Sequence, residues 1–315
     1  MFLIVALAAA AASGVVVVGV LATRGHVPGA PKLRAGRPPL TLDLGIRSDS
    51  EARALARAQT LYRQGKVEQA AAIFHRHRSL EAQVGSAMAA WPSSTVGRLL
   101  ELQAEHPHSS LVALHLGLAL YWSRKEADAA GAWRSAARLQ PDTPYAVRAG
   151  DFLHPRFAPG LPRFVPSFTL PAQIGKLPAR EQLAALRRES AGGGAPAKIL
   201  YGTALQQLGK PVSAERQFAA AARLAPNDPE ARTAAAVGLF DKGNPARAFS
   251  RLGPLTEVFP HAQTVRFHLG LMLVWSAQVK EGRRQFRLAV REDPRSALGR
   301  QANQYLRALG NVRTG

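Results

Sequence analysis

The chain has 315 residues, of which 47% are hydrophobic, so it is long enough for two modest domains or one extended helical array. It contains no cysteine, which excludes disulfide frameworks, thiolate nucleophiles and cysteine-ligated zinc or iron–sulfur sites. The formal net charge of +20 suits an anionic partner, but the basic residues are scattered, and no zinc-finger or RNP-like motif accompanies them. We therefore expect a solvated basic surface and keep a basic nucleic-acid-binding protein as an alternative.

The first segment of the chain, residues 2–22, contains no charged residue. As a helix it would be roughly 31 Å long, which is enough to cross a bilayer. A cleaved signal peptide is the competing interpretation, because the residues leading up to Ala22 have a spacing that a signal peptidase accepts. However, no Lys or Arg precedes the apolar run, and the run exceeds the roughly 7 to 15 residues of a signal peptide. We predict an uncleaved transmembrane anchor over residues 1–23.

The residues that follow this segment indicate its orientation. Arg24, Lys32, Arg34 and Arg37 come shortly after it, and the positive-inside tendency places such flanks in the cytoplasm. We expect a single-pass protein of the cell membrane with a cytoplasmic body, and the alternative is an extracytoplasmic or secreted protein. Residues 24–50 are rich in Pro and Gly, which predicts a stiff, extended tether.

One pattern recurs along the rest of the chain: two small residues twelve positions apart, then Trp, Phe or Leu, then a small or apolar residue, and finally Pro. The clear copies are Gly117, Ala129, Trp133, Ala136 and Pro141; Gly202, Ala214, Phe218, Ala221 and Pro226; Ala236, Ala248, Leu252, Leu255 and Pro260; and Gly270, Gly282, Phe286, Ala289 and Pro294. The last three prolines follow one another at a spacing of 34 residues. Small residues allow two helices to approach closely, the aromatic residue fills the space between them, and Pro ends the second helix.

This spacing resembles that of the tetratricopeptide repeat (TPR) family over nearly all of the chain beyond residue 50. The early Trp that is usual in the family is absent from every copy. A partial copy begins near Glu51, and a shortened copy contains a break at Trp91-Pro92. The resemblance implies an all-α solenoid of stacked helical hairpins that binds other proteins.

Two stretches of the array are related to each other. Residues 115–123 read HLGLALYWS and residues 268–276 read HLGLMLVWS, an offset of 153 residues. We therefore predict two three-hairpin blocks, residues 51–149 and residues 195–295, followed by a capping helix and tail over residues 296–315.

Residues 150–194 form the predicted connector between the blocks. Its six prolines exclude a long helix, and we expect one helix near its end, from Pro178 to Ser190. Four Phe residues in a loop seldom remain in water, so we expect the connector to pack on a block. These residues are Phe152, Phe157, Phe164 and Phe168.

The sequence contains no motif that indicates catalysis. His75 with His77 and His106 with His108 have apparent metal-ligand spacing, but no further ligand set such as H-E-x-x-H accompanies them. A G-x-S-x-G motif and a phosphate-binding loop are absent from the sequence. We predict a non-enzymatic protein with no catalytic residue, no cofactor and no metal.

The resemblance also implies where a protein partner would bind, because the first helix of each TPR hairpin lines a concave groove. The candidate groove residues are Leu114, Leu118, Tyr121, Phe267, Leu271 and Val274. Such a groove would select an apolar or amphipathic segment, unless the Phe-rich connector already fills it. His115 and His268 are equivalent residues of the two blocks, and we interpret them as part of the structural packing.

We predict a non-enzymatic scaffold or adaptor that gathers protein partners at the membrane. The alternatives are an extracytoplasmic or secreted TPR assembly factor and the basic nucleic-acid-binding protein.

Overall fold

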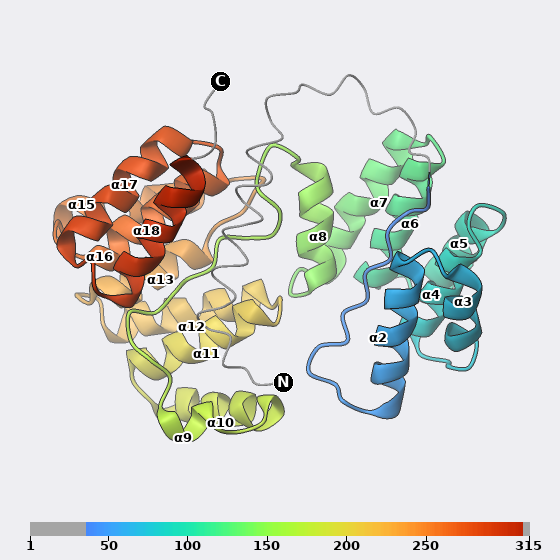
Figure 1. The fold of residues 1–315 in the computed structure, drawn as a ribbon, viewed down its shortest axis with the longest axis horizontal. Coiled ribbons are helices and arrows are strands. Elements are labelled where there is room, and N and C mark those ends of the chain that lie inside the picture. The colour runs from blue at the N-terminus through green and yellow to red at the C-terminus, as the bar shows by residue number, and fades with distance from the viewer. Residues whose placement is uncertain (1–35, 311–315) are drawn as a thin grey trace. The chain divides into compact units, whose positions relative to one another are not determined.

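The computed structural model describes residues 36–310, and every element of regular structure among them is a helix. These residues divide into two compact units (Figure 1), which we call the N-terminal unit, residues 36–153, and the C-terminal unit, residues 154–310. The predicted membrane segment, residues 2–22, lies outside the described residues. Within residues 36–310, no helix is long and apolar enough to cross a membrane.

The N-terminal unit consists of three helical hairpins and a single helix. Its helices are α2 (Ser50–Arg63), α3 (Val67–Phe74), α4 (Leu80–Ala89), α5 (Thr95–Glu105), α6 (Ser110–Trp122), α7 (Glu126–Leu139) and α8 (Pro144–Leu153). Helix α2 begins where the Asp49 carboxylate accepts the Ala52 N–H at 2.9 Å, and its buried residues recur every three or four positions. Gly65, at a φ of 79°, turns the chain into α3.

The C-terminal unit repeats this arrangement with additions at its start. Its helices are α9 (Ala172–Gly175), α10 (Ala179–Gly192), α11 (Ala195–Gln207), α12 (Pro211–Leu224), α13 (Pro229–Gly238), α14 (Ala246–Leu252), α15 (Leu255–Val258), α16 (Gln263–Trp275), α17 (Val279–Glu292) and α18 (Ala297–Gly310). Helices α11 and α12, and likewise α16 and α17, form hairpins. In the hairpin between them, Pro254 begins a new helix, so the second arm consists of α14 and α15.

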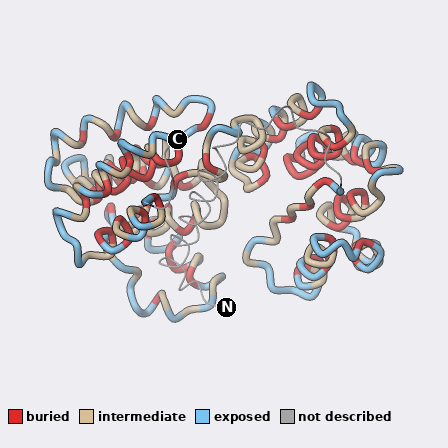
Figure 2. Tube along the Cα trace, turned by 45° about the horizontal axis from the view of Figure 1, so that its top comes forward, coloured by how far each residue is buried: buried red, intermediate tan, exposed pale blue. Residues whose placement is uncertain are grey.

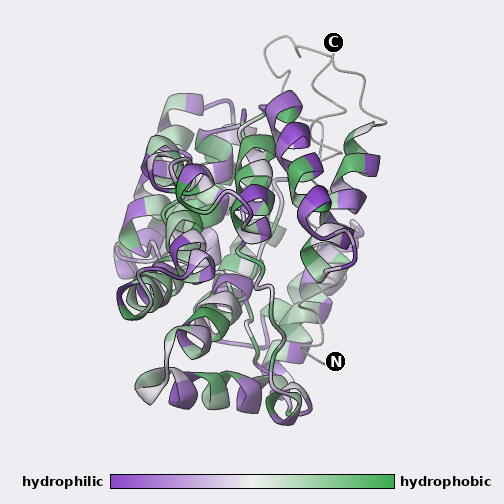
Figure 3. Ribbon diagram, turned by 90° about the vertical axis from the view of Figure 1, so that its left-hand side faces the viewer, coloured by the Kyte–Doolittle hydropathy of each residue, from purple (hydrophilic) through white to green (hydrophobic). Residues whose placement is uncertain are grey.

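Three hairpins, α6–α7, α11–α12 and α16–α17, close around a glycine opposite an aromatic ring, as the repeat pattern predicts. A Cβ atom on Gly117 would lie 2.4 Å from the Trp133 ring, and one on Gly270 would lie 2.9 Å from the Phe286 ring. Buried residues accordingly follow the interior of each unit (Figure 2), and polar residues alternate with apolar ones along the helices (Figure 3). Residues 36–310 therefore form an all-helical array of stacked hairpins.

A single helix covers the last hairpin of each unit. In the N-terminal unit the Phe152 ring of α8 stacks on Trp133, with centroids 4.7 Å apart and planes at 19°. In the C-terminal unit the Tyr305 ring of α18 stacks on Phe286 at 5.0 Å and 7°. The two pairs are related by the same offset of 153 residues, so the duplication includes this capping helix. The N-terminal unit consequently continues to Leu153, beyond the predicted boundary at residue 149.

Candidate functional site

An extended segment of the chain lies against the first helices of the hairpins in the N-terminal unit. We call residues 37–44 the first strap. Leu40 and Leu42 are buried at 3% and 8% exposure, and both belong to the hydrophobic core of the unit. The described part of the predicted tether is thus packed against the hairpins rather than extended into solvent.

Side chains from the first helices of two hairpins and from the capping helix α8 bind the main chain of the first strap. The Tyr62 hydroxyl of α2 donates to the Pro38 carbonyl at 2.8 Å. The Thr41 N–H donates to His115 Nε2 of α6 at 3.1 Å, and the Asp43 N–H donates to the Tyr145 hydroxyl of α8 at 2.8 Å. These three side chains, Tyr62, His115 and Tyr145, mark the face of the unit that contacts the strap, and we call this face its inner surface.

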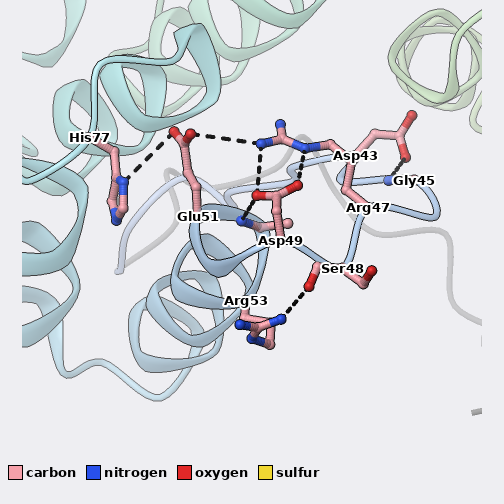
Figure 4. Close-up of polar contacts among 9 residues, drawn as sticks. Asp43, Gly45, Arg47, Ser48, Asp49, Glu51, Arg53 and His77 are labelled. Atoms are coloured by element: carbon pink, nitrogen blue, oxygen red, sulfur yellow. Dashed lines mark hydrogen bonds and ion pairs between the residues drawn. The ribbon is translucent and has the colours of Figure 1, made fainter.

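A polar network fixes the chain between the first strap and α2 (Figure 4). The Arg47 guanidinium donates to both carboxylate oxygens of Asp49, at 3.0 and 3.2 Å, and lies 3.7 Å from Glu51. The hydrogen bonds from Arg47 and from the Ala52 N–H lower the pKa of Asp49 to about 2. This carboxylate therefore stays ionised and continues to cap α2 over the ordinary pH range.

Part of the Phe-rich connector occupies the inner surface of the C-terminal unit in the same way. We call residues 157–168 the second strap. Phe164 is 1% exposed, and its ring stacks on His268 with centroids 4.5 Å apart and planes at 14°. The Val165 N–H donates to His268 Nε2 at 2.9 Å. The connector thus packs on the second block through Phe157, Phe164 and Phe168, whereas Phe152 belongs to α8 and packs on the first block.

Further contacts hold the second strap along its length. The Phe164 N–H donates to Gln206 of α11 at 2.9 Å, and the Ser167 N–H donates to Glu230 of α13 at 2.6 Å. Near the start of the strap, the buried Lys242 ammonium donates to the Ala158 carbonyl at 2.7 Å. Burial raises the pKa of Glu230, and the hydrogen bond from Ser167 acts in the opposite direction.

The two strap-binding histidines make the same pair of hydrogen bonds, one to a carbonyl of their own helix and one to a strap N–H. His115 Nδ1 lies 2.8 Å from the Leu111 carbonyl, and His268 Nδ1 lies 2.7 Å from the Thr264 carbonyl. A carbonyl only accepts, so each Nδ1 carries the proton and each Nε2 is free to accept the strap N–H. Burial lowers the pKa of both residues to about 4, which keeps the imidazoles neutral as this geometry requires.

The candidate groove residues lie on the same helices as these histidines, at positions one before, three after and six after each of them. Tyr121 contacts Trp133 of α7, and Val274 would contact any side chain added at Gly282 of α17. Phe267 contacts α17 and α18 through their aromatic rings. The other three residues, Leu114, Leu118 and Leu271, are at most 3% exposed. Their partner-binding role remains a prediction, and the contacts found here are structural.

The residues that sequence reasoning missed are the histidines and the polar side chains around them. A His in an otherwise apolar helix, repeated at the same place in both copies, was the available signal. Packing alone does not account for it, because each ring accepts a strap N–H over a sequence separation of 74 or 103 residues.

Most of the excess positive charge belongs to the C-terminal unit. The N-terminal unit has 14 Lys and Arg against 11 Asp and Glu, whereas the C-terminal unit has 23 against 10. Exposed basic residues recur on one face of α17, at Lys280, Arg284 and Arg287, and take no part in the strap hydrogen bonds. Within residues 36–310, no cluster of His, Asp and Glu could hold a metal ion.

No protein-family model and no curated protein matches the chain. Solved structures to which it is similar include YrrB, described as a TPR protein with an unusual peptide-binding site, at 17% identity and a TM-score of 0.33, covering 65% of this chain and 97% of that chain. The TPR2AB domain of yeast Sti1, in its pHSP90 complex, is 12% identical with a TM-score of 0.31, and the match covers 83% of this chain and 98% of that chain. Yeast Tom70 is 12% identical with a TM-score of 0.33, and the match covers 93% of this chain and 69% of that chain.

Proposed function

We propose that the chain is a non-enzymatic scaffold that binds protein partners and is tethered to the membrane by residues 2–22. One observation carries the binding part: the inner surface of each unit holds an extended polypeptide segment through bonds from side chains to its main chain. Such bonds depend little on the sequence of the bound segment, so the same surface chemistry suits extended segments of other proteins.

The tether is supported by the sequence. Residues 2–22 are uncharged and long enough to cross a bilayer, and basic residues follow them. These features favour a cytoplasmic location for both units, and an extracytoplasmic assembly factor is the alternative. Protease treatment of intact cells separates the two, because digestion of residues 36–310 from outside contradicts the cytoplasmic location.

Position-specific crosslinking tests the scaffold. A photoreactive residue replaces Gln59, whose amide contacts the Leu40 carbonyl on the inner surface, or exposed Arg134 on α7 as the matched control. Crosslinks to defined proteins from position 59 in membranes, absent or different at position 134, are expected. Identical products from both positions, or none from either, contradict inner-surface binding.

A further inference from the structure

The two straps present N–H groups to their units at the same spacing. Leu40 and Phe164 are each buried, and the N–H of the next residue donates to the histidine of that unit, His115 or His268. Two residues further on, the Asp43 N–H donates to the Tyr145 hydroxyl of α8, and the Ser167 N–H donates to the Glu230 carboxyl of α13, which is not the equivalent helix.

The residue between these two N–H groups differs between the straps. It is Leu42 in the first strap and Pro166 in the second, and Pro has no N–H to donate. The inner surface of the N-terminal unit therefore recognises two buried apolar side chains, Leu40 and Leu42, and the N–H groups of the alternate residues Thr41 and Asp43. This is the pattern of an extended segment presenting one edge. In the second strap the Phe164 N–H also donates, to Gln206.

The two straps are held with different strength. Two buried ionisable side chains, Lys242 and Glu230, bind the second strap, at 2.7 and 2.6 Å. In the first strap, from Pro38 to Asp43, the partners are uncharged side chains. The strap's charged residue Arg37 is exposed to solvent and donates to the Ala89 and Trp91 carbonyls at 3.5 and 3.1 Å. Hydrogen bonds to charged groups are stronger than those between neutral groups, so the first strap is the easier one to displace.

We propose that the inner surface of the N-terminal unit exchanges its strap for an extended segment of a partner protein. The partner segment carries large aliphatic residues at alternate positions, matching Leu40 and Leu42, with unsubstituted N–H groups at the residues that correspond to Thr41 and Asp43. Proline is accepted between those two residues and excluded at them. This inference rests on the proposed scaffold function and names the ligand of one of its two surfaces.

Peptide binding to the full chain tests the exchange. The probe is a fluorescein-labelled peptide of residues 36–46, and its binding is measured by anisotropy to the wild type and to the strap variant Leu40→Asp/Leu42→Asp. The strap variant should bind at least about tenfold more tightly, because its own strap no longer competes. Far-UV circular dichroism establishes that the variant is folded. If it is not, Thr41→Pro, which removes only the N–H that His115 accepts, replaces it in the comparison.

N-methylated peptides test the register. Methylation at residue 41 removes a bond to a buried acceptor and should weaken binding about tenfold or more, whereas methylation at residue 42 should change it less than about threefold. Equal effects of the two methyl groups, equal affinity of wild type and strap variant, or no binding to a folded variant would each overturn the exchange. If crosslinking from position 59 succeeds while the peptide fails, the scaffold stands and only the ligand assignment is lost.

Discussion

Replacing His115 by Gln should remove much of the acid sensitivity of the N-terminal unit. Gln retains both hydrogen bonds, because its amide N–H donates to the Leu111 carbonyl and its carbonyl accepts the Thr41 N–H. Unlike His, it does not titrate. The substitution therefore separates the protonation of this residue from the bonds that it makes.

The magnitude follows from the pKa of His115, which burial lowers from 6.5 to about 4. Below pH 6.5 this residue takes up a proton in the unfolded chain but not in the folded chain. Its contribution to the free energy of unfolding is therefore fully present above pH 6.5 and is lost as the pH falls towards 4. The whole effect corresponds to about 3 kcal/mol, of which about 2 kcal/mol is lost at pH 5. The lowered pKa of Asp49 acts only at lower pH.

Urea unfolding at about pH 7.5 and pH 5 measures this difference. Tryptophan fluorescence reports mainly on the N-terminal unit, which contains three of the four Trp residues. The wild type should lose about 2 kcal/mol more than His115→Gln between the two pH values, and the exposed-residue control His108→Gln should behave like the wild type. Equal losses in wild type and His115→Gln would refute the reasoning. The equivalent test at His268 is less direct, because the raised pKa of Glu230 acts in the opposite direction.

Three further substitutions probe the packing. Ala277→Gly should stabilise the C-terminal unit by about 1 kcal/mol in urea unfolding, because Ala277 has a φ of 62°. Gly117→Ala should destabilise the N-terminal unit by about 1–3 kcal/mol, since the new Cβ would lie 2.4 Å from Trp133. Phe164→Ala should cost about 3–5 kcal/mol and raise hydrogen exchange in the C-terminal unit, because it empties a fully buried site.

Each of these substitutions has a control or a contrary outcome. Gly97→Ala, on α5 with nothing within 4 Å of its Cβ position, should be neutral or stabilising by up to about 1 kcal/mol. If Gly117→Ala behaves in the same way, the close approach at that hairpin is not tight. A loss of stability in Ala277→Gly would show that strain at this turn is negligible. Unchanged exchange in Phe164→Ala would mean that the second strap contributes little to its unit.

Several elements follow from the sequence because they depend on local spacing. The predicted helix from Pro178 to Ser190 corresponds to α10, and the predicted final helix corresponds to α18. The placement of small residues opposite aromatic rings also follows, since a hairpin brings those positions together whatever surrounds it. The sequence did not predict which positions of each helix face the inner surface. Neighbouring residues of one helix, such as Leu114 and His115, face different partners, and periodicity cannot distinguish a helix that is covered on every side.

By itself the sequence determined the helical hairpins and their duplication, because each depends on residue type and spacing along the chain. Only the tertiary structure decided what covers the inner surfaces and where each unit ends. The strap contacts join residues 74 and 103 positions apart, and no local pattern records which N–H will meet which imidazole. Likewise, α8 joins the N-terminal unit because Phe152 stacks on Trp133, a contact that forms only when the helices pack.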